Sequence, residues 1–330
     1  MMQTRTLGPF SVSALGLGCM SLSHAYGTPP DPGTAANVLL KALDLGYNFF
    51  DTAALYGFGA NESLLGNALK MRRNAYVLAS KCGMFRNAQG MREIDGRPEV
   101  LKKTCEDSLK RLQTDVIDLY YLHRWDKKVP IEDSVGAMSD MVKVGKVKTI
   151  GLSEVSADTL RRAHRVHPIT ALQTEYSLWT RNAEIAVLDT CRELGTGFVA
   201  FSPIARGFLS GELRDVSTLP AKDIRLAMPR FQGENFSKNV KLLDGFKTIA
   251  REHACTMAQL ALAWLLAKSP NIVPIPGTTR VDHLAENAGA VNVRLTPGTV
   301  ERLDGLINAH TVSGARYNRA TQTEIDTEGG

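Results

Sequence analysis

The stretch YNFFDTAALYGFGANE, residues 47–62, separates two candidate folds. An apolar run in it ends at Asp51, and Gly57 and Gly59 follow in the next turn. A dinucleotide-binding turn of the Gly-x-Gly-x-x-Gly type needs a third glycine three residues after the second, and the chain has Glu62 there. This stretch therefore argues against a dinucleotide-binding Rossmann unit.

The rest of the chain repeats one arrangement, in which a short apolar run is followed by a stretch with the 3.6-residue period of an amphipathic helix. The runs are Ala14–Gly18, Tyr47–Phe50, Tyr76–Ala79, Val116–Leu122, Thr149–Leu152, Thr170–Gln173, Gly197–Phe201 and Asn271–Ile275. This alternation predicts parallel strands with crossover helices, in either a doubly wound sheet or a closed barrel. A second glycine pair, Gly16 and Gly18, also lacks a third glycine. We therefore predict an α/β fold, a (β/α)8 TIM barrel in one domain over residues 1–330.

Three segments stand outside the alternation. Residues Thr6–Val12 predict an N-terminal β-hairpin that could plug the bottom of the barrel. The long loop after the seventh strand, Ser202–Asn239, is rich in Gly and Pro, and loops of this length are often lids over a site. The acidic residues Glu324, Asp326 and Glu328 are interpreted as a solvated end.

Composition and charge exclude several classes of protein. The 330 residues have a formal charge of +5, which is too small and too evenly spread to indicate nucleic-acid binding. Five cysteines without a Cys-x-x-Cys pair indicate a reducing compartment, and with no His-Glu-x-x-His sequence we expect no metal site. No apolar run reaches the ~18–20 residues of a membrane span, and the N-terminus lacks a signal-peptide core. We expect a cytoplasmic protein with no membrane segment.

Polar residues follow several of the apolar runs, and strand ends are where a barrel gathers its catalytic groups. These residues include Asp51, Lys81 and His123, with Tyr56 on the loop after Asp51. An ammonium group beside a phenol lowers the phenol's pKa from about 10. A carboxylate paired with that ammonium group keeps the ammonium group charged. An imidazole could orient a substrate oxygen. The set predicts Tyr56 as a general acid toward a carbonyl that accepts a hydride.

Each of the four residues also has a purely structural interpretation. Asp51 could cap a turn, Tyr56 could cover the core, Lys81 could be a solvated strand end, and His123 could be a core histidine. Four such groups at strand ends make the joint structural interpretation much weaker than any one of these alternatives.

The end of the eighth strand predicts an anion site. Gly277–Arg280 supplies hydroxyl groups, backbone N–H groups and a guanidinium just before a helical stretch. Barrels often bind phosphate after the seventh and eighth strands. An ordinary turn with a surface arginine is the alternative.

These residues resemble the aldo/keto reductase superfamily over most of the chain, from about Leu7 to Tyr317. The matching blocks are Gly46–Ala53 with Tyr56–Gly57, Ser80–Lys81, Asp118–His123, Gly145–Val147, Ile150–Ser153, Gln173–Leu178, Phe201–Pro203, Arg206–Gly211, Ile275–Thr278 and Glu286–Asn287. Pro229–Phe231 with Glu234–Phe236 further resembles a bacterial, plant and yeast branch that includes perakine-reductase-like enzymes.

The resemblance implies a barrel that binds NADPH or NADP+ along its C-terminal rim and reduces aldehydes or ketones to alcohols. It implies Tyr56 as proton donor, Lys81 as the group that lowers its pKa, Asp51 as the partner of Lys81, and His123 as the group that positions the carbonyl. Further cofactor residues that it indicates are Gly18, Met20, Asp51, Ser153, Gln173, Phe201, Ser202, Pro203, Arg206, Leu209, Ser210, Gly211, Ile275, Gly277, Thr278, Thr279, Glu286 and Asn287. Among them, Ser153 and Gln173 match residues that hold the nicotinamide carboxamide. Phe201 matches the aromatic residue that stacks on the nicotinamide.

Four positions depart from the family pattern. The chain has Glu154 where asparagine is frequent, Phe201 where tyrosine is common, Gly277 in place of a lysine, and His283 in place of a later arginine. These departures leave Arg280 as the residue expected to bind the adenosine 2′-phosphate.

The substrate is expected to be a small carbonyl compound. Trp125, Tyr26 and Phe85 are candidate walls of its pocket, together with Met20 and Tyr317, and such walls suit aromatic or medium-chain aldehydes. An alternative function is an NADP-binding regulatory subunit resembling the β subunits of potassium channels. A lyase or isomerase that uses Lys81 as a Schiff base is disfavoured, because a charged amine is not nucleophilic. The physiological substrate, the reaction direction and the oligomeric state stay open.

Overall fold

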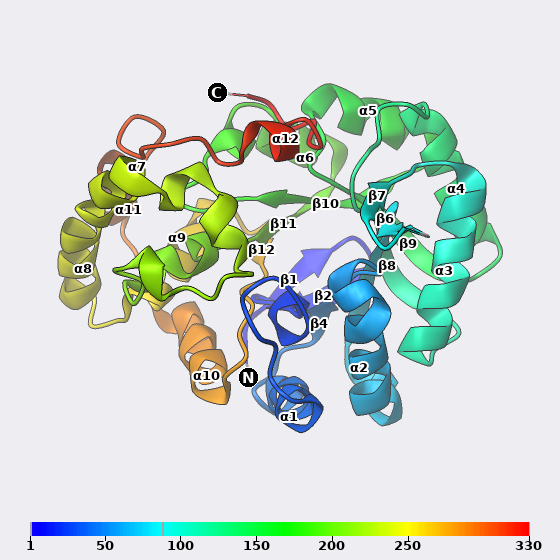
Figure 1. The fold of residues 1–330 in the computed structure, drawn as a ribbon, viewed down its shortest axis with the longest axis horizontal. Helices are drawn as coiled ribbons and strands as arrows, with labels where there is room; N and C mark the ends of the chain where they lie inside the picture. Colours follow the sequence, from blue (N-terminus) through cyan, green and yellow to red (C-terminus); the bar gives the residue numbers. More distant parts are fainter. Residues whose placement is uncertain (1, 88, 330) are drawn as a thin grey trace.

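Eight parallel strands form one sheet in the computed structural model, which describes residues 2–87 and 89–329 (Figure 1). In the order of the sheet the strands are β12 (Ile272–Pro274), β11 (Gly197–Phe201), β10 (Ile169–Glu175), β9 (Val147–Ser153), β8 (Ile117–Leu122), β5 (Val77–Cys82), β4 (Phe49–Asp51) and β3 (Leu17–Gly18). The two outer strands meet, because the N–H groups of Gly16 and Gly18 donate to the carbonyls of Pro274 (2.9 Å) and Pro276 (3.2 Å). The predicted barrel is confirmed, and each apolar run contributes one strand.

Helices surround the strands and occupy the crossovers (Figure 1). They are α1 (Pro32–Asp44), α2 (Ala60–Leu69), α3 (Pro98–Leu112), α4 (Ile131–Lys143), α5 (Ala157–Val166), α6 (Val187–Leu194), α7 (Gly233–Val240), α8 (Leu242–Glu252), α9 (Met257–Lys268), α10 (Val281–Gly289), α11 (Pro297–Leu306) and α12 (Arg319–Gln322). Local sequence sets their starts. In α9, for example, Thr256 and Gln259 form a reciprocal capping box, which satisfies N–H groups that have no partner inside the helix.

The N-terminal hairpin is also present, as β1 (Thr4–Leu7) and β2 (Phe10–Ser13). Leu7 and Val12 are fully buried against side chains of the barrel interior, including Phe49, Tyr121 and Val273. The hairpin therefore closes the interior of the barrel as predicted, and leaves the opposite end of the strands for the site.

One local prediction needs correction, and one element was not predicted. Residues Ser202–Asn239 are not loop throughout: they fold into 3-10 turns and end in α7, where Phe236 and Asn239 are buried. The expected lid is therefore partly helical. A second hairpin, β6 (Met84–Arg86) with β7 (Arg92–Ile94), lies between β5 and α3 and was not predicted.

The acidic segment near the chain's end is bound to the barrel, and its prediction as a solvated end is wrong. The Asp326 carboxylate accepts hydrogen bonds from Ser156 N (3.0 Å) and Thr159 Oγ1 (2.7 Å), and Glu328 accepts one from Ala157 N (2.7 Å). These carboxylates sit at the N-terminus of α5, where free N–H groups and the helix dipole attract negative charge.

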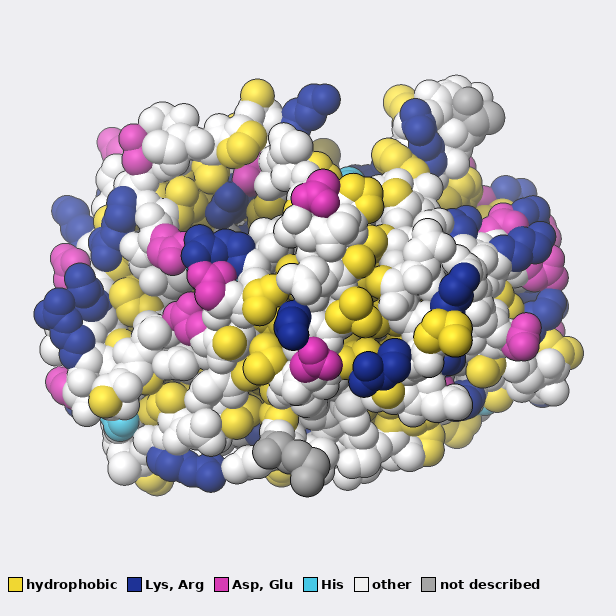
Figure 2. All heavy atoms as spheres, turned by 90° about the horizontal axis from the view of Figure 1, so that it is seen from below, with side chains coloured by type: hydrophobic (Ala, Val, Ile, Leu, Met, Phe, Trp, Pro, Cys, Tyr) yellow, Lys and Arg dark blue, Asp and Glu magenta, His cyan; other side chains and the backbone are white. Residues whose placement is uncertain are grey.

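The surface carries charges of both signs. On the face shown in Figure 2, Lys and Arg side chains are interspersed with Asp and Glu side chains and with apolar patches. Within the described ranges, no helix is both long enough and apolar enough to cross a membrane. The same residues contain no cluster of three or more His, Cys, Asp or Glu side chains suited to a metal ion.

Candidate active site

A cavity of about 740 Å³ opens at the carboxyl ends of the barrel strands, and its size suits a small-molecule site. Its floor consists of strand-end residues that are distant in the sequence. They are Gly18 from β3, Asp51 from β4, His123 after β8, Ser153 from β9, Gln173 from β10, Phe201 from β11 and Ile275 after β12. The structure therefore brings together the residues that the strand-end argument selected.

Lys81 lies under this floor with no solvent exposure and makes three polar contacts. Its ammonium group pairs with the Asp51 carboxylate, donates to the Thr52 carbonyl (2.8 Å) and donates to the Tyr56 hydroxyl (3.2 Å). The other Asp51 oxygen accepts a hydrogen bond from Gln173 Nε2 (2.7 Å). Because both ends of the ion pair are hydrogen-bonded, the pair can stay charged in a buried place.

The electrostatics of Tyr56 differ from the sequence-based expectation. Burial raises the pKa of the Tyr56 phenol above its ordinary value, and the Lys81 charge opposes this rise without cancelling it. Burial alone would lower the pKa of Lys81, but the neighbouring Asp51 carboxylate and Tyr56 oxygen outweigh burial and raise it. Tyr56 is therefore a neutral phenol held next to a firmly charged ammonium group.

His123 packs its ring edge-on against Tyr56, with ring centroids 5.8 Å apart. Burial, and then the charges of Arg124 and Lys81, place its pKa well below the ordinary value, so the imidazole is neutral at pH 7. Within the described part of the chain, its buried Nδ1 atom has no hydrogen-bond partner. A neutral imidazole at this point can donate one hydrogen bond to a ligand.

The backbone after β11 has the features of a phosphate cradle. Ser202 (φ 50°), Ala205 (φ 48°) and Arg206 (φ 58°) have left-handed backbone, which costs free energy in residues other than glycine and tends to occur at functional sites. At the meeting of the outer strands, a Cβ atom on Gly277 would lie 2.8 Å from the Gly18 carbonyl. Glycines leave room for a ligand close to the backbone, and left-handed residues can aim successive N–H groups at an anion. Both features lie along one rim and fit an elongated, phosphate-bearing cofactor such as NADP(H).

Most of the predicted cofactor residues line the cavity. They are Gly18, Met20, Asp51, Ser153, Gln173, Phe201, Ser202, Pro203, Arg206, Ser210, Ile275, Gly277, Thr278, Thr279, Glu286 and Asn287. Leu209, Gly211 and Arg280 are not among the lining residues. Leu209 is fully buried, and the exposed Arg280 pairs with Asp282.

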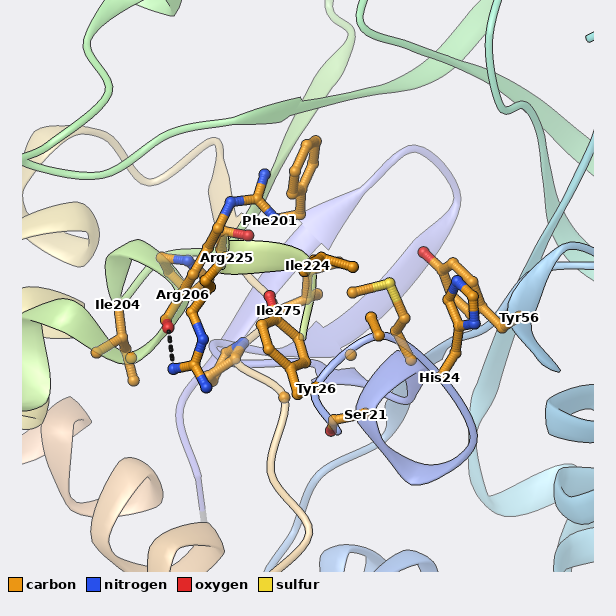
Figure 3. Close-up of a pocket in the computed structure, with 18 of the residues that line it drawn as sticks. Ser21, His24, Tyr26, Tyr56, Phe201, Ile204, Arg206, Ile224, Arg225 and Ile275 are labelled. Carbon is orange, nitrogen blue, oxygen red and sulfur yellow. Dashed lines mark hydrogen bonds between the residues drawn. The ribbon is translucent and has the colours of Figure 1, made fainter. Parts of the chain in front are cut away.

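The predicted substrate walls are only partly in place. Tyr26 lines the cavity, with the Arg225 guanidinium over its ring at 5.3 Å, and Figure 3 shows these two side chains together. Trp125 does not line the cavity: its indole N–H donates to the Val129 carbonyl (2.7 Å). Phe85 is in β6 and also lies outside the lining.

Sequence reasoning missed several lining residues. Arg124 directly follows His123 at the end of β8, so the strand-end rule could have selected it. His24, whose ring lies 6.4 Å from that of Tyr56, and Arg92, on β7, carry no comparable signal, because neither follows a barrel strand directly.

A buried ionic cluster supports one wall of the cavity. Glu154, at the position where the family pattern has asparagine, pairs with Arg316 (2.5 Å), and Arg316 also contacts Glu175 (2.9 Å). Glu175 in turn pairs with Arg206 (2.6 Å), which also donates to the Tyr317 hydroxyl (3.0 Å). Burial alone would raise the pKa of Glu175, but Arg206 and Arg316 outweigh it and lower the pKa to about 2.

Comparison with known proteins shows the family to which the chain is similar. The model of the aldo/keto reductase family matches residues 14–308. A probable aldo-keto reductase of Glycine max is 45% identical over 309 residues, which cover 93% of this chain and 89% of that protein.

Two solved structures extend the likeness. The glycerol dehydrogenase of Gluconobacter oxydans superposes with a TM-score of 0.87 at 26% identity, over 95% of this chain and 97% of that one. An aldo-keto reductase of Klebsiella pneumoniae in complex with NADPH gives a TM-score of 0.74 at 25% identity, over 96% and 99%.

Proposed function

The chain belongs to the aldo/keto reductase family and is an NADP(H)-dependent oxidoreductase, and on this premise we propose that it reduces aldehydes or ketones to alcohols with Tyr56 as the proton donor. When bound, NADPH supplies the hydride that the carbonyl carbon accepts. The proton on the Tyr56 hydroxyl passes to the carbonyl oxygen as negative charge develops there.

The observation that carries this proposal is the 3.2 Å contact between the Lys81 ammonium and the Tyr56 hydroxyl. The raised pKa of Tyr56 keeps its proton in place at pH 7 until an oxygen of greater basicity forms beside it. The adjacent ammonium then stabilises the phenolate that remains. Asp51 holds this ammonium charged and in position.

His123 has the geometry of a positioning group for the same oxygen. Its ring contacts Tyr56, and its low pKa leaves it neutral, so it can donate a hydrogen bond without competing as an acid. Ser153 and Gln173 would hold the carboxamide of the cofactor, and Phe201 would lie against the nicotinamide ring. The cradle after β11, with Ser202 to Ser210, would receive the pyrophosphate.

The test is a Tyr56→Phe variant. Loss of the general acid should lower kcat for carbonyl reduction by about 10²–10⁴-fold. NADPH affinity, measured by fluorescence titration, should stay unchanged. Tyr76→Phe is the matched control, because Tyr76 is a buried tyrosine on the outside of the barrel, packed against Phe50. Normal turnover by Tyr56→Phe would remove Tyr56 from the acid role.

A screen of NADPH oxidation across aldehydes, diketones and sugars, run beside NADH, tests the function as a whole. Rapid turnover of at least one class supports the reductase. Tight NADPH binding with negligible turnover of every class would favour the regulatory-subunit alternative.

A further inference from the structure

Four arginine side chains line the cavity, and three of them are neutralised by carboxylates. The pairs are Arg92 with Glu324, Arg206 with Glu175 (2.6 Å) and Arg225 with Asp223 (2.7 Å). Among residues 2–87 and 89–329, no carboxylate oxygen lies within 4.0 Å of the fourth, Arg124. Arg124 therefore has no direct ion-pair partner among the described residues. The buried Glu154 carboxylate, which its charge influences at longer range, is already paired with Arg316.

The placement of Arg124 is fixed by two hydrogen bonds from a single nitrogen. Its Nη1 donates to the His123 carbonyl (2.7 Å) and to the Ser153 hydroxyl (3.0 Å). Its other nitrogens make no hydrogen bond with the described residues. These nitrogens are not among the buried polar atoms that lack a partner, so they stay accessible from the cavity. An anionic group of a ligand could accept hydrogen bonds from them.

The location of Arg124 shows which part of a bound complex it would face. Figure 3 shows Tyr56 at one end of the cavity and Arg206, in the cradle after β11, at the other. Arg124 directly follows His123, whose ring packs on Tyr56, so it lies at the Tyr56 end. An anion that meets Arg124 there belongs to the substrate, because the cofactor phosphates are expected at the cradle.

We propose that the preferred substrates are aldehydes or ketones that carry a carboxylate or phosphate group, and that Arg124 binds this group while the carbonyl oxygen faces Tyr56 and His123. The inference rests on the proposed function and adds the substrate class. A bidentate guanidinium contact to a carboxylate or phosphate provides both affinity and orientation.

The other charges of the cavity are consistent with this assignment. At the Tyr56 end, Asp51 is neutralised by Lys81 and Glu324 by Arg92. The remaining carboxylates of the lining are Glu212, in the segment after β11, and Glu286, in α10. His283 lies 3.8 Å from Glu212. The charges of Arg124, Lys81 and Arg92 all lower the pKa of His123, after burial, which indicates positive potential at this end.

The experiment compares matched probes that differ in one anionic group. Succinic semialdehyde is paired with butanal, and glyceraldehyde 3-phosphate with glyceraldehyde, so the two pairs separate a carboxylate from a phosphate. For at least one pair, the wild-type enzyme should favour the anionic probe in kcat/KM by tenfold or more, mainly through KM. Arg124→Gln should lower kcat/KM for the anionic probe at least tenfold more than for its neutral counterpart, and Arg124→Lys should restore part of the preference.

Arg302→Gln is the matched control, because it also removes one positive charge. Arg302 is on α11 and forms an exposed ion pair with Glu252, the last residue of α8. This substitution should leave the preference unchanged. Equal losses for anionic and neutral probes in Arg124→Gln would mean that Arg124 only supports His123 and Ser153, and would overturn the proposal. Equal wild-type rates for both members of each pair would overturn it as well.

A binding measurement separates this inference from the proposed function. Calorimetry of 4-hydroxybutyrate and glycerol 3-phosphate with the NADP+ complex needs no turnover. Binding that Arg124→Gln weakens tenfold supports the anion site even if no probe is reduced. Binding that is insensitive to Arg124→Gln overturns the anion site even if reduction proceeds normally.

Discussion

At the scale of single residues, the site depends on charges held where water cannot reach them. Lys81 has no solvent exposure, and its three partners replace the water that a free ammonium would bind. Removing the Asp51 carboxylate would leave that charge uncompensated, which is far more costly than losing a surface pair. The same logic separates Arg124, which is half-buried and unpaired, from Arg280, which is exposed and paired.

Arg280 and Asp282 give opposite predictions for cofactor preference. The Asp282 carboxylate binds Nε and Nη2 of Arg280 and would compete with a 2′-phosphate for this guanidinium. Asp282→Ala should therefore tighten NADPH binding several-fold and leave NADH binding unchanged. Arg280→Ala should weaken NADPH binding roughly 10–100-fold, the loss of one charge-assisted contact, and spare NADH. Fluorescence titration of both cofactors measures this. Equal changes for NADPH and NADH in either variant would contradict the role of Arg280.

At the scale of elements, close packing of helices depends on positions where a side chain has no room. A Cβ atom at Gly66, in α2, would lie 2.4 Å from the Arg111 carbonyl oxygen and 2.8 Å from the Leu112 carbonyl carbon at the end of α3. These are backbone atoms of α3, which cannot move aside as the end of a flexible side chain can, so α2 would have to shift away from α3. Gly136, in α4, has open space at the corresponding point.

These two glycines form a matched pair for a stability measurement. Gly66→Ala should lower the free energy of unfolding by about 1–3 kcal/mol, because α2 and α3 must separate. Gly136→Ala should raise it by about 0.5–1 kcal/mol, because alanine is the better helix former. Urea denaturation of both variants measures the two effects. Similar stability changes for the two variants would mean that the contact at Gly66 is not limiting.

A strand or helix could be predicted from the sequence where a short stretch of residues carries its pattern. The barrel strands are continuous apolar runs, so composition alone marks them, and their order follows from the repeated alternation with helices. The β6–β7 hairpin was missed because Met84–Arg86 and Arg92–Ile94 are short and lie outside the barrel. The helix Gly233–Val240 was missed because Gly and Pro dominate the preceding segment.

At the scale of the whole molecule, the ionic cluster connects segments that are remote in the chain. Arg316 and Glu154 are separated by 162 positions and lie side by side only after folding. No local pattern encodes such a contact, and for that reason the binding of the acidic segment to α5 was predicted wrongly. The pKa direction of Tyr56 was missed for a related reason, because burial is a property of the complete fold.

Glu175 predicts how stability depends on pH. Its pKa is lowered to about 2 in the folded chain, so its contribution is complete above the unfolded value of about 4.5 and is lost as pH falls toward 2. Glu175→Gln should cost about 3 kcal/mol at pH 7, since it leaves Arg206 and Arg316 without their shared carboxylate. Between pH 4.5 and 2 the variant should lose less stability than the wild type.

Denaturant titrations at pH 7, 4 and 3 measure this difference, with Glu252→Gln as the exposed control. Glu252 pairs with Arg302 at the surface, so its substitution should change stability little at any of these pH values. Parallel pH profiles for the wild type and Glu175→Gln would show that the cluster does not stabilise the fold in this way.

The meeting of β3 and β12 links folding to ligand occupancy. Two backbone hydrogen bonds, from Gly16 and Gly18, join these strands in the described chain, and Gly18 and Gly277 at this joint also line the cavity. A bound dinucleotide that contacts both Gly18 and Gly277 would hold the two outer strands together and stabilise the folded state. The enzyme without cofactor should therefore open locally at this joint, and limited proteolysis there should slow when NADPH is added.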